Sequence, residues 1–372
     1  MNKAHLLSPI LLAAISISAI AGEADLKTED AKVLEEASQK KDSALKIVPL
    51  ITSSPLLGTG VGAAASYLYS TDGENSSKSQ LKIGGQYSNT ESYNLFAANN
   101  AFFRNNSIIS TTLASYSSVN NEFATAGDDA EYNVSSVAIS ELLLYEAWEN
   151  FYIGGMISYK KIINDPTNAS GEDFIDQNGI LDQEAGDFGF AVSYDTRKNK
   201  YFPSSATWVT LRLNTAPSWL GAEDDYYYTI LNARYYAKGF NDGDVWAWQF
   251  YGQYSSEKTP DTGLPTLSGK SLLRGFPAGK FKALYLSGIQ TEYRYQIPNT
   301  RFRLVAFAGV AHLSGGSYGA HGSSRDDDGW YSAGGVGARY AIQPKTGVDL
   351  RLDLVTTSDN EQSIYVMLGQ SF

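Results

Sequence analysis

The sequence contains no cysteine and three histidines among its 372 residues. Without cysteine the chain has no disulfide framework, no thiol nucleophile and no thiolate metal site. His5 lies in the predicted leader, so any histidine chemistry in the mature chain has to use His312 or His321. These absences exclude disulfide-stapled secreted scaffolds and thiol-dependent enzymes.

Long hydrophobic runs are also missing. Beyond the N-terminus no window approaches the roughly 18 apolar residues that a membrane-spanning helix needs. The N-terminus itself has the features of a secretory signal peptide: a positive start at Lys3, an apolar stretch from Leu6 to Ile20 and an Ala-Ile-Ala ending. We predict that residues 1–21 are removed on export and that the mature chain begins near Gly22.

The chain also has no excess of basic residues, because 40 acidic and 29 basic residues give a formal net charge of −11. An acidic chain lacks the basic surface that nucleic acid requires, so we expect no nucleic-acid partner. We interpret the acidic clusters as loop solvation, with ion bridging to a lipopolysaccharide surface as the alternative. The clusters are Asp128-Asp129, Glu172-Asp173, Glu223-Asp224-Asp225 and Asp326-Asp327-Asp328.

Residues 22–44 differ from the rest of the chain. Leu26, Val33, Leu34 and Ala37 fall at helical spacing among Lys and Glu, which predicts a short periplasmic helix. The segment is too short for a folded domain. It is either a linker or a small plug, and both interpretations stay open.

From about residue 45 onward the hydrophobic pattern has a period of two. Apolar residues alternate with charged ones in mid-strand, as in 289–297 and 348–354. A soluble sandwich would bury the apolar face and leave the charges in water, whereas a transmembrane barrel puts the apolar face on lipid and the charges in a wet lumen. The mean hydropathy of −0.25 does not exclude a barrel, because the two faces average out.

Loop lengths favour the barrel. Short links at 104–106, 149–150, 241–244 and 299–300 alternate with long polar links, the pattern of outer-membrane barrels. The long links are 120–133, 163–183, 257–282 and 314–329.

We therefore predict an all-β fold, a transmembrane antiparallel β-barrel over residues 45–372, with both termini periplasmic. Sixteen strands are expected, with fourteen as the alternative, because Pro49 interrupts the first strand and 79–103 could form one long strand. The expected strands are 45–53, 57–69, 79–87, 91–103, 106–119, 134–147, 151–162, 184–196, 205–216, 224–239, 244–256, 283–297, 301–313, 330–343, 347–357 and 362–372.

The aromatic content supports the same fold. The chain has 25 Tyr, 16 Phe and 6 Trp, which suits the aromatic girdles of a membrane barrel. We expect Trp246, Trp248, Tyr293 and Tyr295 to face lipid at or near a girdle.

Three segments carry a resemblance to a known family. The turn residues Asp195, Arg197 and Asn199, followed by Pro203, resemble an Asp-x-Arg-x-Asn periplasmic turn. The loop residues Leu273, Arg274, Gly275 and Phe276 resemble a Val/Leu-Arg-Gly-Phe/Tyr signature. The C-terminal run contains Gly335 to Tyr340 and Leu350 to Asp353 and ends at Phe372, as an assembly signal does. Together these segments resemble the barrel of the BamA/TamA family, the bacterial surface antigen superfamily of outer-membrane assembly and translocation proteins.

The resemblance implies that the loop carrying Arg274 folds back into the lumen, where Glu292 pairs with the guanidinium. Such a cation inside a lumen needs an acceptor, and a carboxylate offers two oxygens. Gly309 stands where the family often has a second acid, so we expect a weaker anchor. Residues 22–44 are too short for a POTRA module, so the chain resembles a barrel-only variant of the family.

The resemblance also implies a location and partners. We expect the outer membrane of a Gram-negative bacterium, with outer-membrane lipids and lipopolysaccharide around the barrel and the barrel assembly machinery as a partner during biogenesis. The leading functional hypothesis is assistance in protein or lipid insertion or translocation. The alternative is a structural or passive pore without assembly activity.

Enzyme signatures are weak. Gly315 to Gly319 matches G-x-S-x-G, but it lies in a Gly-rich loop, whereas a nucleophile elbow needs a strand-turn-helix context. Asp176 to Asp182 resembles part of a calcium loop, but Phe174 and Ala185 stand at two ligand positions. We predict no catalytic residues, no metal site, no cofactor and no enzymatic activity.

Overall fold

Backbone pairing organises the described part of the chain. A computed structural model describes residues 45–54, 58–73, 76–123, 129–178, 180–260, 263–267, 272–276, 281–318, 324–325, 327–343 and 348–368. The predicted signal peptide, the predicted helix in 22–44 and Phe372 lie outside these residues. Within them, no helix has the length and apolarity to cross a membrane.

Sixteen antiparallel strands form one sheet in chain order, with β13 paired to β16 across a small hairpin. They are β1 (Leu45–Ser54), β2 (Gly58–Tyr69), β3 (Ser79–Ser88), β4 (Tyr93–Phe103), β5 (Ile108–Phe123), β6 (Ala130–Trp148), β7 (Phe151–Pro166), β8 (Gln183–Asp195), β9 (Ala206–Ala216), β10 (Tyr226–Lys238), β11 (Val245–Ser255), β12 (Tyr285–Gln296), β13 (Phe302–Ser314), β16 (Gly329–Gln343), β17 (Val348–Thr357) and β18 (Gln362–Leu368).

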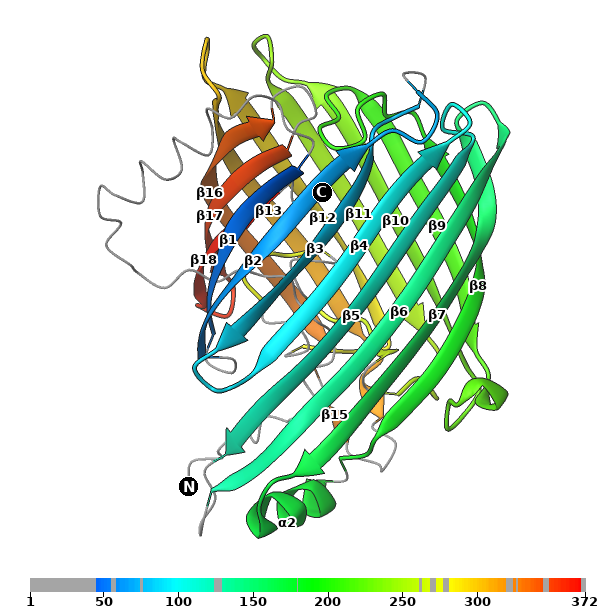
Figure 1. Cartoon of the computed structure of the whole chain (residues 1–372), viewed down its shortest axis with the longest axis vertical. Helices are drawn as coiled ribbons and strands as arrows, with labels where there is room; N and C mark the ends of the chain where they lie inside the picture. The colour runs from blue at the N-terminus through cyan, green and yellow to red at the C-terminus, as the bar shows by residue number, and fades with distance from the viewer. Residues whose placement is uncertain are drawn as a thin grey trace.

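This sheet confirms the predicted fold class. Residues 79–103 form two strands joined at Glu91, whose positive φ of 59° turns the chain, so the fourteen-strand alternative is wrong. Pro49 is accommodated within β1, the first strand in the sheet order. Figure 1 shows the sheet curved into a barrel-shaped wall. A β1–β18 seam that closes this wall remains a prediction.

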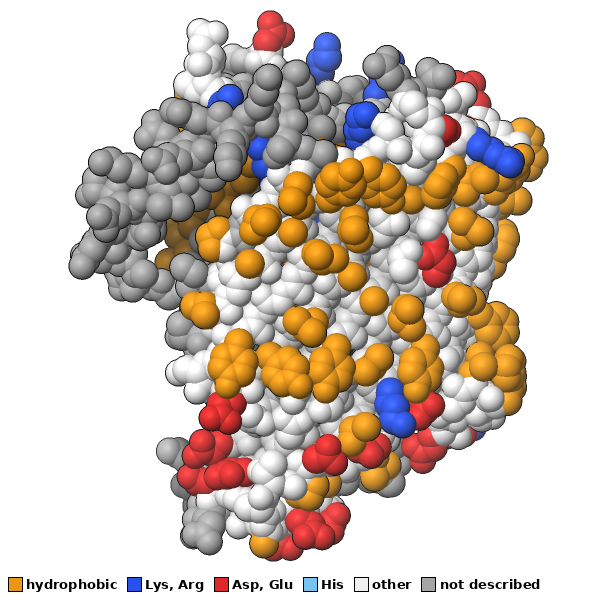
Figure 2. Space-filling model, in the orientation of Figure 1, with side chains coloured by type: hydrophobic (Ala, Val, Ile, Leu, Met, Phe, Trp, Pro, Cys, Tyr) orange, Lys and Arg blue, Asp and Glu red, His pale blue; other side chains and the backbone are white. Residues whose placement is uncertain are grey.

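Side chains alternate between the two faces of the wall as a membrane barrel requires. On β11, Val245, Ala247 and Gln249 are buried, while Trp248 and Phe250 are exposed. Figure 2 shows two bands of hydrophobic side chains across the visible face, with acidic side chains gathered beyond the lower band. The charged interior and apolar exterior are the reverse of a soluble protein.

An aromatic cluster marks one end of β11 and β12. Trp246 stacks on Trp248 with ring centroids 5.7 Å apart, and Tyr293 meets Trp246 edge-on at 5.5 Å. Phe240 of the short β10–β11 turn adds a fourth ring, 5.6 Å from Tyr293. The hydroxyl of Tyr293 donates to Asp244 at 2.6 Å. Tyr295 is half-buried on the same strand. The rings thus gather beside a short turn, where a girdle is expected.

Three expected loops, 120–133, 163–183 and 314–329, contain regular structure instead. β5, β6 and β7 run further than predicted, because polar side chains continue the pairing beyond the apolar surface: the Asn133 amide donates to Asn120 Oδ1 at 2.7 Å. Figure 1 shows these strands extending to the end where α2 (Ala169–Asn178) lies. Asn168 caps this helix by accepting from the Gly171 N–H at 2.7 Å.

The link 314–329 contains the hairpin β14 (Ser317–Tyr318) and β15 (Ser324–Arg325). Between β9 and β10 lies the 3₁₀ turn η1 (Ser218–Leu220).

A closed antiparallel barrel in a membrane should resist SDS until heated. We expect the protein from outer-membrane fractions to migrate faster on a gel when unheated than after boiling, because the folded barrel stays compact. A soluble periplasmic protein that shows no such shift would contradict the barrel.

Candidate functional site

Part of the long β11–β12 loop lies inside the wall. Leu272, Leu273 and Phe276 are at most 2% exposed, although they belong to a loop. They pack in one cluster with residues of β10, β11, β12, β13, β16 and β17. The loop therefore packs on the interior face of strands that precede it and strands that follow it in the chain, from β10 to β17.

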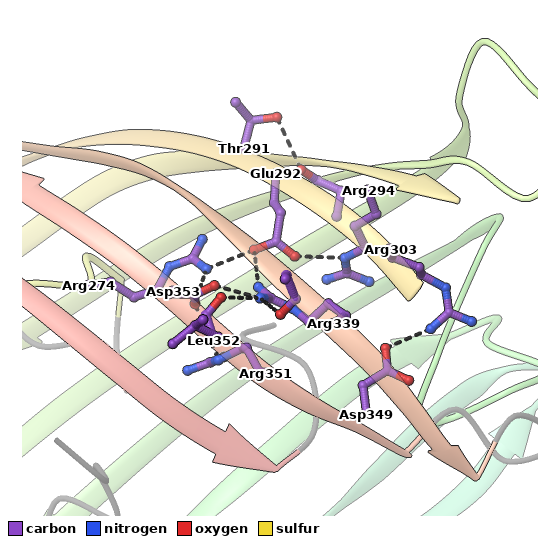
Figure 3. Close-up of polar contacts among 12 residues, drawn as sticks. Arg274, Thr291, Glu292, Arg294, Arg303, Arg339, Asp349, Arg351, Leu352 and Asp353 are labelled. Atoms are coloured by element: carbon purple, nitrogen blue, oxygen red, sulfur yellow. Dashed lines mark hydrogen bonds and ion pairs between the residues drawn. The ribbon is translucent and has the colours of Figure 1, made fainter. Parts of the chain in front are cut away.

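Arg274 is held by two carboxylates. Its Nη1 lies 2.8 Å from Glu292 Oε2 on β12 and 2.9 Å from Asp353 Oδ2 on β17. The guanidinium carbon stands 3.4 Å from the ring centroid of Phe307 on β13. Figure 3 shows Arg274 reaching into this group from the loop. The structure thus brings Arg274 and Glu292 together and adds Asp353, which the sequence did not indicate as a partner.

The glycine at position 309 does not leave Arg274 with a single acidic partner. Asp353 supplies the second carboxylate from another strand. A Cβ on Gly309 would lie 2.7 Å from Leu273 Cδ2, so glycine here leaves room for the loop. The expectation of a single acidic partner for Arg274 is therefore wrong.

Gly275 has a backbone role. Its φ of +97° is in the left-handed region that glycine adopts freely. A Cβ would lie 2.5 Å from Thr357 Cγ2 and 2.9 Å from Val355 Cγ1. Its N–H donates to the Tyr365 hydroxyl on β18 at 3.1 Å. Glycine is thus required for the loop to approach β17 and β18 closely.

Three more guanidinium groups surround the two carboxylates. Arg294 Nε lies 2.8 Å from Glu292, Arg339 Nη1 lies 2.5 Å from Asp353, and Arg351 Nε lies 3.3 Å from Asp353. Arg339 also reaches Glu292 at 3.4 Å. We call these four arginines and two acids the lumen cluster; its members are at most 5% exposed and carry a formal charge of plus two. Arg339, Arg351 and Asp353 were noted in the sequence only as part of the C-terminal run; their signal was charge in mid-strand on the polar face.

The predicted turn motif begins at Asp195, the last residue of β8, and forms a second site. Asp195 accepts from Arg197 Nε and Nη2, each at 2.8 Å, and from Lys200 Nζ at 2.9 Å. Asn199 Oδ1 accepts from the N–H groups of Tyr201 and Phe202 at 3.0 Å each. Arg197 lies 3.6 Å above the Trp208 ring. Pro203 is buried after these residues. The motif residues therefore fix the shape of a ten-residue connection, 196–205.

Two aromatic residues of this turn, which the sequence did not single out, contact two adjacent groups of strands in the wall. Tyr201 packs against the cluster formed by residues of β4 to β8, and its hydroxyl donates to the Lys78 carbonyl before β3 at 2.9 Å. Phe202 packs on β9, β10 and β11, with Arg303 at 4.2 Å from its ring. We call residues 196–205 the inward turn. The sequence signal that could have identified these two residues was a pair of adjacent aromatic side chains within a polar turn.

The inward turn meets the lumen cluster at Arg294, and a further arginine outside the cluster, Arg303, contacts the same ring. Arg294 of the cluster lies 5.7 Å from the Phe202 ring. Arg303 contacts the same ring and pairs with Asp349 at 2.7 Å. The two inward-folded segments are therefore linked by side-chain contacts.

The residues considered for catalysis lie elsewhere. His312 packs its ring 4.7 Å from Trp330, and Ser317 lies in the β14–β15 hairpin. His321 is outside the described residues. Among the described residues, no group of three or more His, Asp or Glu is arranged to hold a metal ion.

Comparison with known proteins gives the fold a context. No family model matches the sequence, and no curated protein does either. The structure is similar to CdiB from Escherichia coli, with 13% identity and a TM-score of 0.65, over 88% of this chain and 63% of that one. CdiB from Acinetobacter baumannii matches with 9% identity and a TM-score of 0.59, over 87% and 59%.

A third similar structure is BamA from Haemophilus ducreyi lacking POTRA domains 1–3. It matches with 15% identity and a TM-score of 0.51, over 89% of this chain and 71% of that one. This chain spans about three fifths of the CdiB chains. At these identities the likeness is one of fold: the chain has an outer-membrane β-barrel fold similar to those of BamA and CdiB.

Proposed function

We propose that this chain is an outer-membrane barrel that assists protein or lipid insertion or translocation, with Arg274 as the lumen anchor of its β11–β12 loop. The observation that carries the proposal is the contact of Arg274 with both Glu292 and Asp353. A buried cation held by acids from two strands positions a loop, and the loop residues around it fill the interior. The likeness in fold to BamA and CdiB supports the same class.

A static, open pore fits the interior less well. The lumen cluster and the inward turn place side chains in the interior, part of the space that a passive pore would leave to water. We infer that passage of a substrate along the axis involves movement of at least one of these segments. The proposed function therefore includes a conformational change in the β11–β12 loop or the inward turn.

The anchor can be tested with Arg274→Ala and Glu292→Gln. Each charge-assisted hydrogen bond is worth about 1.5–3 kcal/mol. Arg274→Ala leaves Glu292 with Arg294 and Arg339, so the barrel should fold while the loop becomes protease-sensitive near Phe276. Glu292→Gln should destabilise more, because it removes an anion from among three cations. Thermal unfolding of the purified barrel measures the difference.

The double variant should be less than additive, as expected for coupled neighbours. Lys258→Ala is the matched control, because Lys258 lies on the same long loop and its pair with Asp224 is over half exposed, where ion pairs contribute little. Additive losses, or a loop equally protected in all variants, would contradict the anchor.

The inward turn generates a separate prediction. Tyr201→Ala and Phe202→Ala should raise the conductance of the reconstituted barrel, because each removes a ring that holds the turn against one side of the wall. Tyr201→Phe loses only the bond to the Lys78 carbonyl and should have a smaller effect. Tyr194→Ala, on the exposed face of β8, is the control. Wild-type conductance in both alanine variants would show that the turn does not restrict the lumen.

A further inference from the structure

The outward face of β6 carries an acidic residue. Four odd-numbered side chains on this strand are exposed, Val137 by 41%, Ile139 by 50%, Leu143 by 51% and Tyr145 by 57%, and Glu141 between them is half-buried. Even-numbered neighbours such as Val134, Ser136 and Leu144 are buried. Glu141 belongs to the outward set, with apolar side chains on both sides of it along the strand.

The neighbouring strands place Glu141 within the apolar surface as well. Ile157 lies directly opposite on β7 and is 63% exposed. On the β5 side, Ser110 Oγ and Thr112 Oγ1 donate to the two carboxylate oxygens at 2.6 and 2.5 Å. The carboxylate is therefore held in a fixed orientation on the lipid-facing wall.

A carboxylate in this position is costly. Charged side chains on the lipid face of a barrel destabilise it most near the membrane midplane, and ionisable residues in a membrane are functional candidates by default. Two hydroxyl donors satisfy part of the carboxylate but bring no opposite charge. Within the described residues Glu141 makes no ion pair; the outward lysine of β7, Lys161, pairs with Glu184 at 3.2 Å.

The surface around Glu141 is open to close approach. Ser110 and Thr112 are small, and Gly155 on β7 pairs with Leu143 and has no side chain. Small residues let backbones of membrane segments come near each other.

We propose that the face of β5, β6 and β7 around Glu141 docks a membrane-embedded segment of another protein that presents a Lys or Arg side chain at this depth. Acyl chains carry no donor, so lipid tails leave the carboxylate uncompensated. A second copy is disfavoured, because a twofold axis along the membrane normal sets Glu141 opposite Glu141 at the same depth, where like charges repel. A basic partner supplies the opposite charge.

The test is photo-cross-linking from position 157 in intact outer membranes, followed by mass spectrometry of the adduct. Glu141→Leu should reduce the adduct by at least about tenfold, the ratio that 1.4 kcal/mol produces. This variant should fold at least as well as wild type, since it puts an apolar group on lipid. The control is Glu184→Gln, which alters an outward carboxylate already paired within the chain and should keep the adduct.

Charge reversal completes the test. Glu141→Lys should abolish the adduct, and changing the basic residue of the identified partner to Glu should restore it. An adduct of the mass of two copies of this chain would overturn the proposal in favour of self-association. Cross-links to lipid alone would overturn it in favour of an unoccupied wall. A protein adduct unchanged by Glu141→Leu would overturn it in favour of docking that does not depend on Glu141.

Discussion

Backbone amides in a hydrocarbon layer have no water to bond, and this constraint determines the architecture of the chain. Each strand of the main sheet bonds to its neighbours in order, so the backbone from β2 to β17 is satisfied between strands, and the predicted β1–β18 seam would satisfy the rest. Because side chains alternate along a strand, one face is then committed to lipid and the other to the interior. The apolar outer face and the charged interior both follow from this arrangement.

The interior has to be filled or hydrated, and the chain fills part of it with two of its own connections. The β11–β12 loop contributes Arg274 and an apolar cluster, and the inward turn contributes Tyr201 and Phe202. Arg294 connects the two segments, because it pairs with Glu292, the partner of Arg274, and lies 5.7 Å from the Phe202 ring. We therefore expect a movement of one segment to displace the other through Arg294.

The same constraint makes the exterior apolar, and Glu141 is an acidic residue on that apolar face. In the interior, carboxylates such as Glu292 and Asp353 are surrounded by guanidinium groups of the same chain. Glu141 has the same chemistry on the opposite face of the wall and finds hydroxyl groups only. The acids on the polar face are compensated within the fold, whereas the compensation that we propose for Glu141 on the lipid face comes from a second molecule.

The sequence by itself determined the strand order and most strand positions, because a period of two and polar turns are local signals. Expected strands at 184–196 and 283–297 differ by one or two residues from β8 and β12. It also indicated Arg274 and Glu292, through the resemblance. Only the tertiary structure decided that Asp353, Arg339 and Arg351 join them, because those contacts link strands distant in the chain. The lipid-facing position of Glu141 and the reach of Tyr201 to Lys78 were decided in the same way, since register and curvature set them.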